Sequence, residues 1–513
     1  MSGAGAVNAF RELLSALPAD PVESSVELLL SQLPGDVATY LRLCAIPHRF
    51  DVATLRALGP DVPPEESERL YQALLELAVV GSGGQVARLH DTARGYLFRQ
   101  WLTPSHRVEL TVASRRLVAH FAARQQAASD ETEIEQFRYS VMFHRLGADE
   151  TAGMREFNAL FKERRRQFRI GDCERLVKLV CEYEPVLRPE SLAVLSYRKG
   201  QNAADYRQWA KARQAFQAVL DNPASDADLR IRTHNRLGML AAAERQHRTA
   251  IACFEQALHL AASSGRGARY THRILRDMGA AHRDLGDLDR AMELLSEAAA
   301  GAQEAGDLPG VAACQNSLGM LHQKRHEIAE AAAAFHASAQ ALEQLTLPVQ
   351  QAKVYDNLGT LHTEVGDWTA SMEAYARSLA ITRAAGDAFG QAITLNNMAR
   401  AHQRSRDDAK AVELFEEAGR IFEQVGDHYG AAQVRRNIGR VHARLKRFAQ
   451  ARDAFTLAIA GFGHIGATEE QEATRRELAR LERRSSLPWW AWTAIVIVAL
   501  LVGLMILVAT YDV

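Results

Sequence analysis

A short pattern recurs along the middle of the chain at a nearly constant spacing, and this spacing limits the fold more than any other feature of the sequence. Each copy is centred on a small residue, and successive copies lie 40 or 41 residues apart. The six small residues are Gly238, Gly279, Gly319, Gly359, Ala399 and Gly439. Internal repeats of this length predict a solenoid, in which each unit buries its apolar face only against its neighbours.

Each copy predicts a pair of helices. A large apolar residue, such as Leu237, precedes the small residue. Further along, a small, a bulky and a second small residue follow at helical spacing, which in the first copy are Ala250, Phe254 and Ala257. This spacing places the three on one helical face. Small residues on such a face let two helices approach closely, and the bulky residue fills the space beside them.

The arrangement of small and bulky residues resembles that of the tetratricopeptide repeat (TPR) family over residues 192–466. A seventh copy lies upstream at Gly200, Ala212 and Phe216. The resemblance implies a mainly α protein with a right-handed α-solenoid of about seven helical hairpins.

The residues around this solenoid predict the flanking segments. An irregular helical linker is expected over 103–191, with room for a degenerate repeat near Gly171. A polar capping helix and linker are expected over 467–487, as is typical for the end of a solenoid.

In peptide-binding members of the TPR family the first helices line a concave groove, and the resemblance implies such a groove here. Asparagine amides suit it, because each offers a donor and an acceptor to an extended backbone. The predicted groove residues are Asn235, Asn316, Asn357, Asn396, Asn397, Asn437, Arg276 and Arg436. An alternative is that the asparagines bond within the helix stack. The two arginines are isolated and do not reproduce the carboxylate clamp of chaperone-binding relatives.

A row of histidines follows the small residues at a fixed distance: His282, His322, His362, His402 and His442. Packed helices lie about 8–10 Å apart, whereas each zinc ligand must approach the ion to roughly 2 Å. In-register residues of successive units therefore cannot share one ion, and we expect these side chains to pack between helices. No metal and no cofactor are predicted.

Residues 488–513 hold an apolar run, Trp489–Ala509, without a charged residue. Its length predicts a transmembrane helix. Trp489, Trp490 and Trp492 would form an interfacial belt, and Arg483 and Arg484 precede it. By the positive-inside rule the N-terminal bulk would be cytoplasmic. The expectation is a single-pass, tail-anchored membrane protein with the lipid bilayer as a partner.

Residues 21–102, after a tail at 1–20, lack the 40-residue period. Short helical patterns and a hairpin around Gly81–Gly84 favour a winged-helix-like module. The stretch resembles the module that follows the NTPase domain of STAND-type signalling ATPases. The residues that carry this resemblance are Phe50, Asp51, Leu70, Leu74, Leu77, Leu89, His90, Asp91, Arg94 and Tyr96.

The phosphate-binding loop of those ATPases requires Gly-Lys, and this dipeptide does not occur in the chain. We therefore expect no NTPase domain and no bound nucleotide. Arginines and carboxylates balance within residues 40–101, so the module lacks the positive charge of a nucleic-acid binder. The run Lys162–Arg166 could contact anionic lipid or nucleic acid, but a solvated helix face is the favoured interpretation.

No catalytic motif is present, and the five cysteines form no C-x-x-C pair. We therefore expect no enzyme. The predicted function is a membrane-anchored cytoplasmic scaffold or adaptor that binds a peptide or protein partner in its groove. The alternative is a regulatory subunit of a STAND-like signalling or defence system that works with a separate NTPase. The sequence indicates neither the partner nor the oligomeric state.

Overall fold

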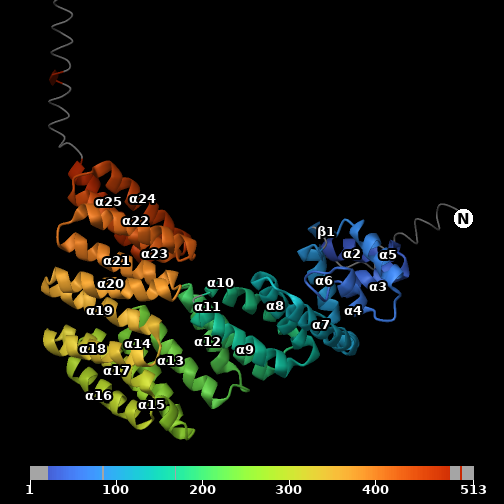
Figure 1. Cartoon of the computed structure of the whole chain (residues 1–513), viewed down its shortest axis with the longest axis horizontal. Helices are drawn as coiled ribbons and strands as arrows, with labels where there is room; N and C mark the ends of the chain where they lie inside the picture. The colour runs from blue at the N-terminus through green and yellow to red at the C-terminus, as the bar shows by residue number, and fades with distance from the viewer. Residues whose placement is uncertain (1–20, 84–85, 168, 486–496, 499–513) are drawn as a thin grey trace, which may run out of the picture. The chain divides into compact units, whose positions relative to one another are not determined.

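The computed structural model describes residues 21–83, 86–167, 169–485 and 497–498. In this part the chain is mainly a helical solenoid of 24 α-helices, α2–α25, with one two-stranded sheet (Figure 1). The chain divides into two compact units. The first comprises Met1–Asp205 with Gln214–Ser225, and the second Tyr206–Arg213 with Asp226–Val513.

The first unit begins with short helices and a hairpin. Its elements are α2 (Pro21–Gln32), α3 (Gly35–Leu43), α4 (Val52–Leu58), α5 (Pro64–Leu75), β1 (Val80–Gly83), β2 (Val86–Leu89) and α6 (Asp91–Trp101). Asp51 caps α4, because its carboxylate accepts a hydrogen bond from the Thr54 amide at 2.8 Å. Phe50, just before this cap, forms an antiparallel bridge with Ala87 of β2. The hairpin therefore gains a third, very short strand partner.

Longer helices follow in the same unit. They are α7 (Arg107–Ala127), α8 (Glu131–Ala148), α9 (Glu150–Arg166), α10 (Ile170–Cys181) and α11 (Pro189–Asp205), with short 3₁₀ helices at Pro104–His106 and Glu184–Val186. A buried ring cluster joins them to α6: the ring centroid of Tyr183 lies 5.3 Å from that of Phe98 and 5.0 Å from that of Phe143. One apolar core thus contains side chains from the N-terminal helices and from α7–α11.

Polar contacts reinforce this junction. The guanidinium of the buried Arg94 donates to Glu182 at 2.8 Å, and His48 bonds to the other carboxylate oxygen of Glu182 at 2.7 Å. Arg94 also lies over the Phe98 ring. Burial of His48 lowers its pKa, despite the carboxylate beside it. These contacts fix the orientation of α6 against the segment after α10.

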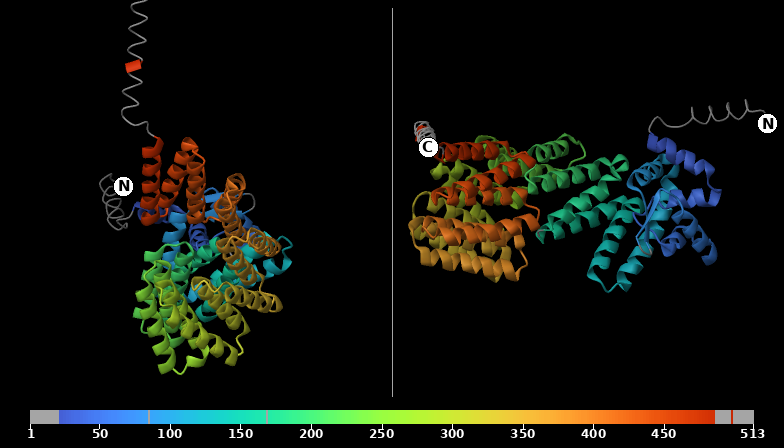
Figure 2. Two further views of the ribbon diagram at one scale, coloured as in Figure 1. Left: turned by 90° about the vertical axis from the view of Figure 1, so that its left-hand side faces the viewer. Right: turned by 90° about the horizontal axis from the view of Figure 1, so that it is seen from above.

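The second unit is a row of helical hairpins in chain order (Figures 1 and 2). α12 (Trp209–Asp221) spans the division between the units. The first helices of the hairpins are α13 (Ala227–Ala243), α15 (Gly267–Leu285), α17 (Leu308–Lys324), α19 (Pro348–Val365), α21 (Ala388–Arg404) and α23 (His428–Arg444). The second helices are α14 (His247–Ser263), α16 (Leu288–Glu304), α18 (Ile328–Gln344), α20 (Trp368–Ala384), α22 (Asp408–Gln424) and α24 (Phe448–His464). α25 (Thr468–Ser485) packs on α24.

The small residue of each hairpin lies against the bulky residue of its second helix. A Cβ atom built on Gly319 would lie 2.7 Å from the Phe335 ring, closer than real Cβ contacts allow. On Gly359 it would lie 2.6 Å from the ring of Tyr375. The recurring small residue is therefore required by the close approach of two helices, as the sequence period predicts.

The turn between the two helices of a hairpin needs a left-handed residue. Gly286 and Gly366 supply it with φ of 98° and 83°, a region that costs glycine little. Other hairpins place a residue with a side chain there instead, namely Arg245, His326, Arg406 and Lys446.

The predicted transmembrane helix over 488–513 was wrong as a description of the fold. Within the described residues no helix is both long enough and apolar enough to cross a bilayer. An apolar run is one condition for a spanning segment and a continuous helix of about 20 residues is the other, and the described part never meets both. The predicted localisation as a single-pass, tail-anchored membrane protein required this helix and is therefore also wrong. Apart from Ile497 and Val498, this segment, including Trp489, Trp490 and Trp492, lies outside the described residues.

Replacing Gly319 by Ala should lower the stability of the second unit by about 1–3 kcal/mol, because the new methyl group overlaps the buried Phe335 ring. Gly301→Ala is the matched control: it lies inside helix α16, where the nearest atom to the new Cβ is at an ordinary 3.4 Å. That variant should gain about 0.5–1 kcal/mol of helix propensity. Urea midpoints followed by circular dichroism measure both, and equal shifts for the two variants would contradict the packing argument.

Candidate partner-binding surface

The residues three and two positions before the small residue connect successive first helices. Asn357 on α19 donates from Nδ2 to Oδ1 of Asn316 on α17 at 2.8 Å. Asn437 on α23 makes the same contact with Asn396 on α21 at 3.4 Å. We call such a contact, from one first helix to the next, a rung.

Two further rungs use charged residues in the same positions. Asn235 on α13 donates to Asp277 on α15 at 3.1 Å. At the other end of the row, Arg436 on α23 donates from Nε to Glu477 on α25 at 3.0 Å. Arg276, in contrast, pairs with Asp277 of its own helix at 2.7 Å. α25 is therefore joined to the last hairpin by the same type of contact that joins the hairpins to each other.

The rungs leave hydrogen-bonding capacity unused. A primary amide has two N–H donors and an oxygen with two lone pairs, and each rung uses one donor and one acceptor. Within the described residues the Nδ2 group of Asn316 and the Oδ1 atom of Asn357 make no hydrogen bond of their own, and Oδ1 of Asn235 is buried without a partner. All of the predicted asparagines except Asn397 thus bond within the helix stack, as one interpretation of the sequence held, and still keep donors and acceptors.

Within the described residues the joint between α15 and α17 has no rung, since Arg276 pairs within its own helix, and neither does the joint between α19 and α21. Here the rung position holds Asp356, which is buried, and its Oδ2 accepts from the Thr394 hydroxyl at 3.1 Å. Its Oδ1 has no partner, and Asn397, the residue that would complete the rung, makes no hydrogen bond in the described part of the chain. Burial raises the pKa of Asp356 to about 7.

Hydroxyl groups surround this joint. Ser378 bonds to Thr394 at 2.9 Å, Thr363 to Ser371 at 2.7 Å, and Thr360 to the phenol of Tyr375 at 3.1 Å. Ser371 and Ser378 stand where most other hairpins have alanine. Asp356 is not among the groove residues predicted from the sequence, although it is the one carboxylate among the six residues at its position in the repeat.

The histidine row lies at the turn of each hairpin. Nδ1 of His282 bonds to Asp287 at 3.1 Å, and His402 does the same with Asp407 at 3.1 Å. Asp407 also caps α22, because its other oxygen accepts from the Lys410 amide. Within the described residues no group of three potential ligands could hold a metal ion. His282, His322 and His402 thus bond to a carboxylate at the turn of their own hairpin. His442 is buried, and its Nδ1 has no partner in the described part of the chain. Packing of the row in the core or between repeats stays a prediction.

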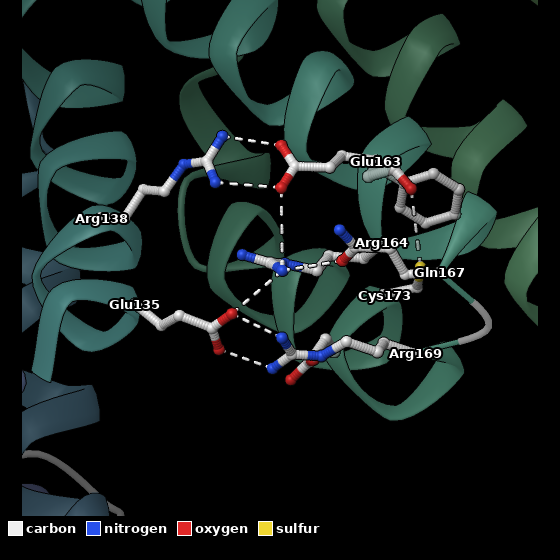
Figure 3. A network of polar contacts seen from close by, with 9 residues as sticks. Glu135, Arg138, Glu163, Arg164, Gln167, Arg169 and Cys173 are labelled. Carbon is white, nitrogen blue, oxygen red and sulfur yellow. Dashed lines mark hydrogen bonds and ion pairs between the residues drawn. The ribbon is translucent and has the colours of Figure 1, made fainter. Parts of the chain in front are cut away.

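The basic run near the end of α9 belongs to an internal network (Figure 3). Arg164 is buried and donates to Gln167 at 2.9 Å, with Glu135 of α8 at 3.0 Å. Glu163 forms a two-pronged pair with Arg138, and Arg165 pairs with Asp205 at 2.7 Å. The interpretation of this run as a solvated face is therefore wrong for Arg164. Since Arg164 and Arg165 are paired with carboxylates within the first unit, these two side chains are poorly placed to bind phosphates.

The raised pKa of Asp356 predicts a pH-dependent stability. Its ordinary value is 3.8, so the folded chain holds this proton more tightly than the unfolded chain. The free energy of unfolding therefore falls as pH rises from about 4 to about 7. Asp356→Asn stays neutral and should remove that loss, so its gain in melting temperature over the wild type should be larger at about pH 8 than at about pH 5.

The exposed Asp453 on α24 provides the control, since Asp453→Asn should change the melting temperature little at either pH. A gain of the same size for Asp356→Asn at both pH values would mean that Asp356 is ionised throughout.

The repeats are similar to those of known protein families. Residues 231–264, 350–424 and 390–462 match models of the tetratricopeptide repeat. No curated protein matches the sequence significantly.

Among solved structures, a STAND protein with a tetratricopeptide repeat sensor from Pyrococcus horikoshii is similar, with 14% identity and a TM-score of 0.42 over 92% of this chain and 66% of that one. The chain thus spans just under two thirds of that protein's length. A Rap protein complexed with Competence and Sporulation Factor has 13% identity and a TM-score of 0.43, over 76% of this chain and 96% of its own. The apo quorum sensor NprR from B. thuringiensis has 11% identity and a TM-score of 0.38, over 69% and 100%. From the repeat models and the helical pairs together, we conclude that this chain carries tetratricopeptide repeats.

Proposed function

We propose that the chain is a non-catalytic scaffold whose first helices bind an extended peptide or a segment of a protein partner. The observation that carries this proposal is the row of rungs with unused donors and acceptors on α13–α23. Repeat proteins of this type present long continuous surfaces rather than enclosed cavities.

The chemistry of the rungs suits a peptide backbone. An extended peptide exposes N–H and C=O groups along both edges, and it needs both a donor and an acceptor from its receptor. Asn316 and Asn357 together offer a free N–H and a free oxygen. Because one neutral hydrogen bond contributes only about 0.5–1.5 kcal/mol, binding would require several rungs at once.

The charges beside the rungs favour acidic side chains in the ligand. Arg400 and Arg404 on α21 are exposed and make no ion pair within the described residues. Arg440 and Arg436 on α23 both pair with the same carboxylate, that of Glu477. Positive charge is therefore in excess around the last rungs.

This function predicts that removing the rungs removes peptide binding. The variant carries Asn316→Ala, Asn357→Ala, Asn396→Ala and Asn437→Ala, which deletes both partners of two rungs and so leaves no orphaned amide. Phage display of random peptides against the full wild-type chain should enrich binders, and the variant should bind the enriched peptides at least ten-fold more weakly.

The control variant is Arg290→Ala with Glu293→Ala, an exposed ion pair on the second helix α16. It should bind like the wild type. If the rung variant kept its affinity within two-fold, the first-helix surface would not be the binding site.

A second candidate function is a regulatory subunit that acts with a separate NTPase. It is favoured by the order of elements in the first unit, in which a strand residue, Phe50, precedes two helices and the β1–β2 hairpin, as in a winged helix. The exposed face of α5 carries Glu65 and Glu68, and Arg69 is paired with Glu66 and Asp36. Such a face suits a protein partner better than a phosphate backbone. This candidate does not require the isolated chain to bind peptides, so the display experiment separates the two.

A further inference from the structure

The two residues that could form a rung between α19 and α21 are present, but they do not bond to each other. Three other joints are closed by a contact between the residue three before the small residue and the residue two before it on the next first helix, and Arg436 makes a similar contact with Glu477 of α25. Asp356 and Asn397 occupy these two positions. Both are present, and Asp356 is turned toward Thr394 instead.

The other joints show that Asp356 is long enough to reach Asn397. In equivalent positions Asn316 meets Asn357 at 2.8 Å and Asn235 meets Asp277 at 3.1 Å. Aspartate has the same length as asparagine and accepts from an amide N–H equally well. A change of side-chain rotamer is therefore sufficient to bring Asp356 from Thr394 to Asn397.

The present position suits the neutral acid. Asp356 is 8% exposed, and one of its oxygens has no hydrogen-bond partner. An ionised carboxylate in such a place loses solvation, and the hydroxyl groups of Thr394 and Ser378 compensate only part of that loss. A neutral carboxyl group is less costly there, and its O–H can donate to a neighbouring hydroxyl.

The charged groups around Asp356 do not offset an ionised form. Asp387, the buried cap of α21, opposes the charge, and Lys353, on α19 itself, is exposed and screened by water. α20 contributes the hydroxyl of Ser378 and the phenol of Tyr375, whose pKa is raised by burial and, to a smaller extent, by Asp356. In the described residues, only Lys353 and the hydroxyls favour the ionised state.

We propose that Asp356 is a two-position switch, turned inward to Thr394 in the structure and able to turn outward to Asn397, where it closes the missing rung between α19 and α21. Loss of its proton favours the outward position, since the charge then leaves the hydroxyl cluster. A ligand that donates an N–H group to Asp356 at the surface would favour it too. The joint is thus a place where the contact between two hairpins can change while the rest of the row stays fixed.

The test follows the side-chain amide of Asn397 by NMR of full-length protein that is ¹⁵N-labelled at asparagine, with signals assigned by single substitutions. In the wild type the Asn397 signal should move with a midpoint at or below about 7, the pKa of the inward Asp356, because an outward ionised state lowers the observed midpoint. The Asn357 and Asn437 amides, which belong to closed rungs, should stay constant over the same range. In Asp356→Asn the titration of Asn397 should vanish.

A second variant separates rotation from simple electrostatic sensing. If Asp356 stays inward, Thr394→Val removes a hydrogen bond that stabilises the carboxylate and the midpoint rises. If the ionised group turns outward, the same variant weakens only the neutral inward state and the midpoint falls. A fall supports the switch. A rise, a constant Asn397 signal in the wild type, or a titration that persists in Asp356→Asn would overturn it.

Discussion

The contact of a small residue with a bulky side chain of the second helix is the constraint on which the repeat unit depends. Gly319 and Gly359 leave no room for a Cβ atom beside Phe335 and Tyr375. Because the two helices approach so closely, the first helix has only one way to lie on the second. The residues before the small one are then carried to the same place in every hairpin, where successive first helices can touch. The rungs, the turn histidines and the joint at Asp356 all follow from this common geometry.

The repeat architecture could be predicted from sequence because steric demands recur at fixed spacing. The pairing of the asparagines could not, since a position in the repeat fixes the face of a helix and not the rotamer of a side chain. Asn316 and Asn357 share a rung across 41 residues, whereas Asp356 in an equivalent position is turned inward. The burial of Arg164 could not be predicted for a related reason. A run of charged residues does not indicate which of them is buried, and this depends on the contacts of Arg164 with Glu135 and Gln167 in the fold. The transmembrane prediction was wrong because it relied on hydropathy alone. An apolar segment is suited to a bilayer, but it spans one only as a continuous helix of about 20 residues, and the described residues contain no such helix.

The hairpin formed by α19 and α20 differs from the other hairpins in the chemistry of its core. Ser371 and Ser378 replace the alanine of most other hairpins near Asp356, and together with Thr363 and Thr394 they hold the local core by hydroxyl hydrogen bonds. Polar networks of this kind are satisfied in few geometries and are costly when a member lacks a partner. The other hairpins rely on apolar contacts, as between Ala250, Phe254 and Ala257. This difference in chemistry concentrates the capacity for change at one joint.

The central claim is that successive first helices are tied by rungs, and a double-mutant cycle on Asn316 and Asn357 tests it most directly. Each single replacement by alanine removes the hydrogen bond and leaves the other amide without its partner. The double replacement removes both amides, so its effect differs from the sum of the single effects by the energy of the contact. We predict a coupling of about 0.5–1.5 kcal/mol in the free energy of unfolding, the net value of one hydrogen bond. Additive effects, with no coupling beyond experimental error, would show that the two asparagines do not interact and would remove the basis for the proposed binding surface.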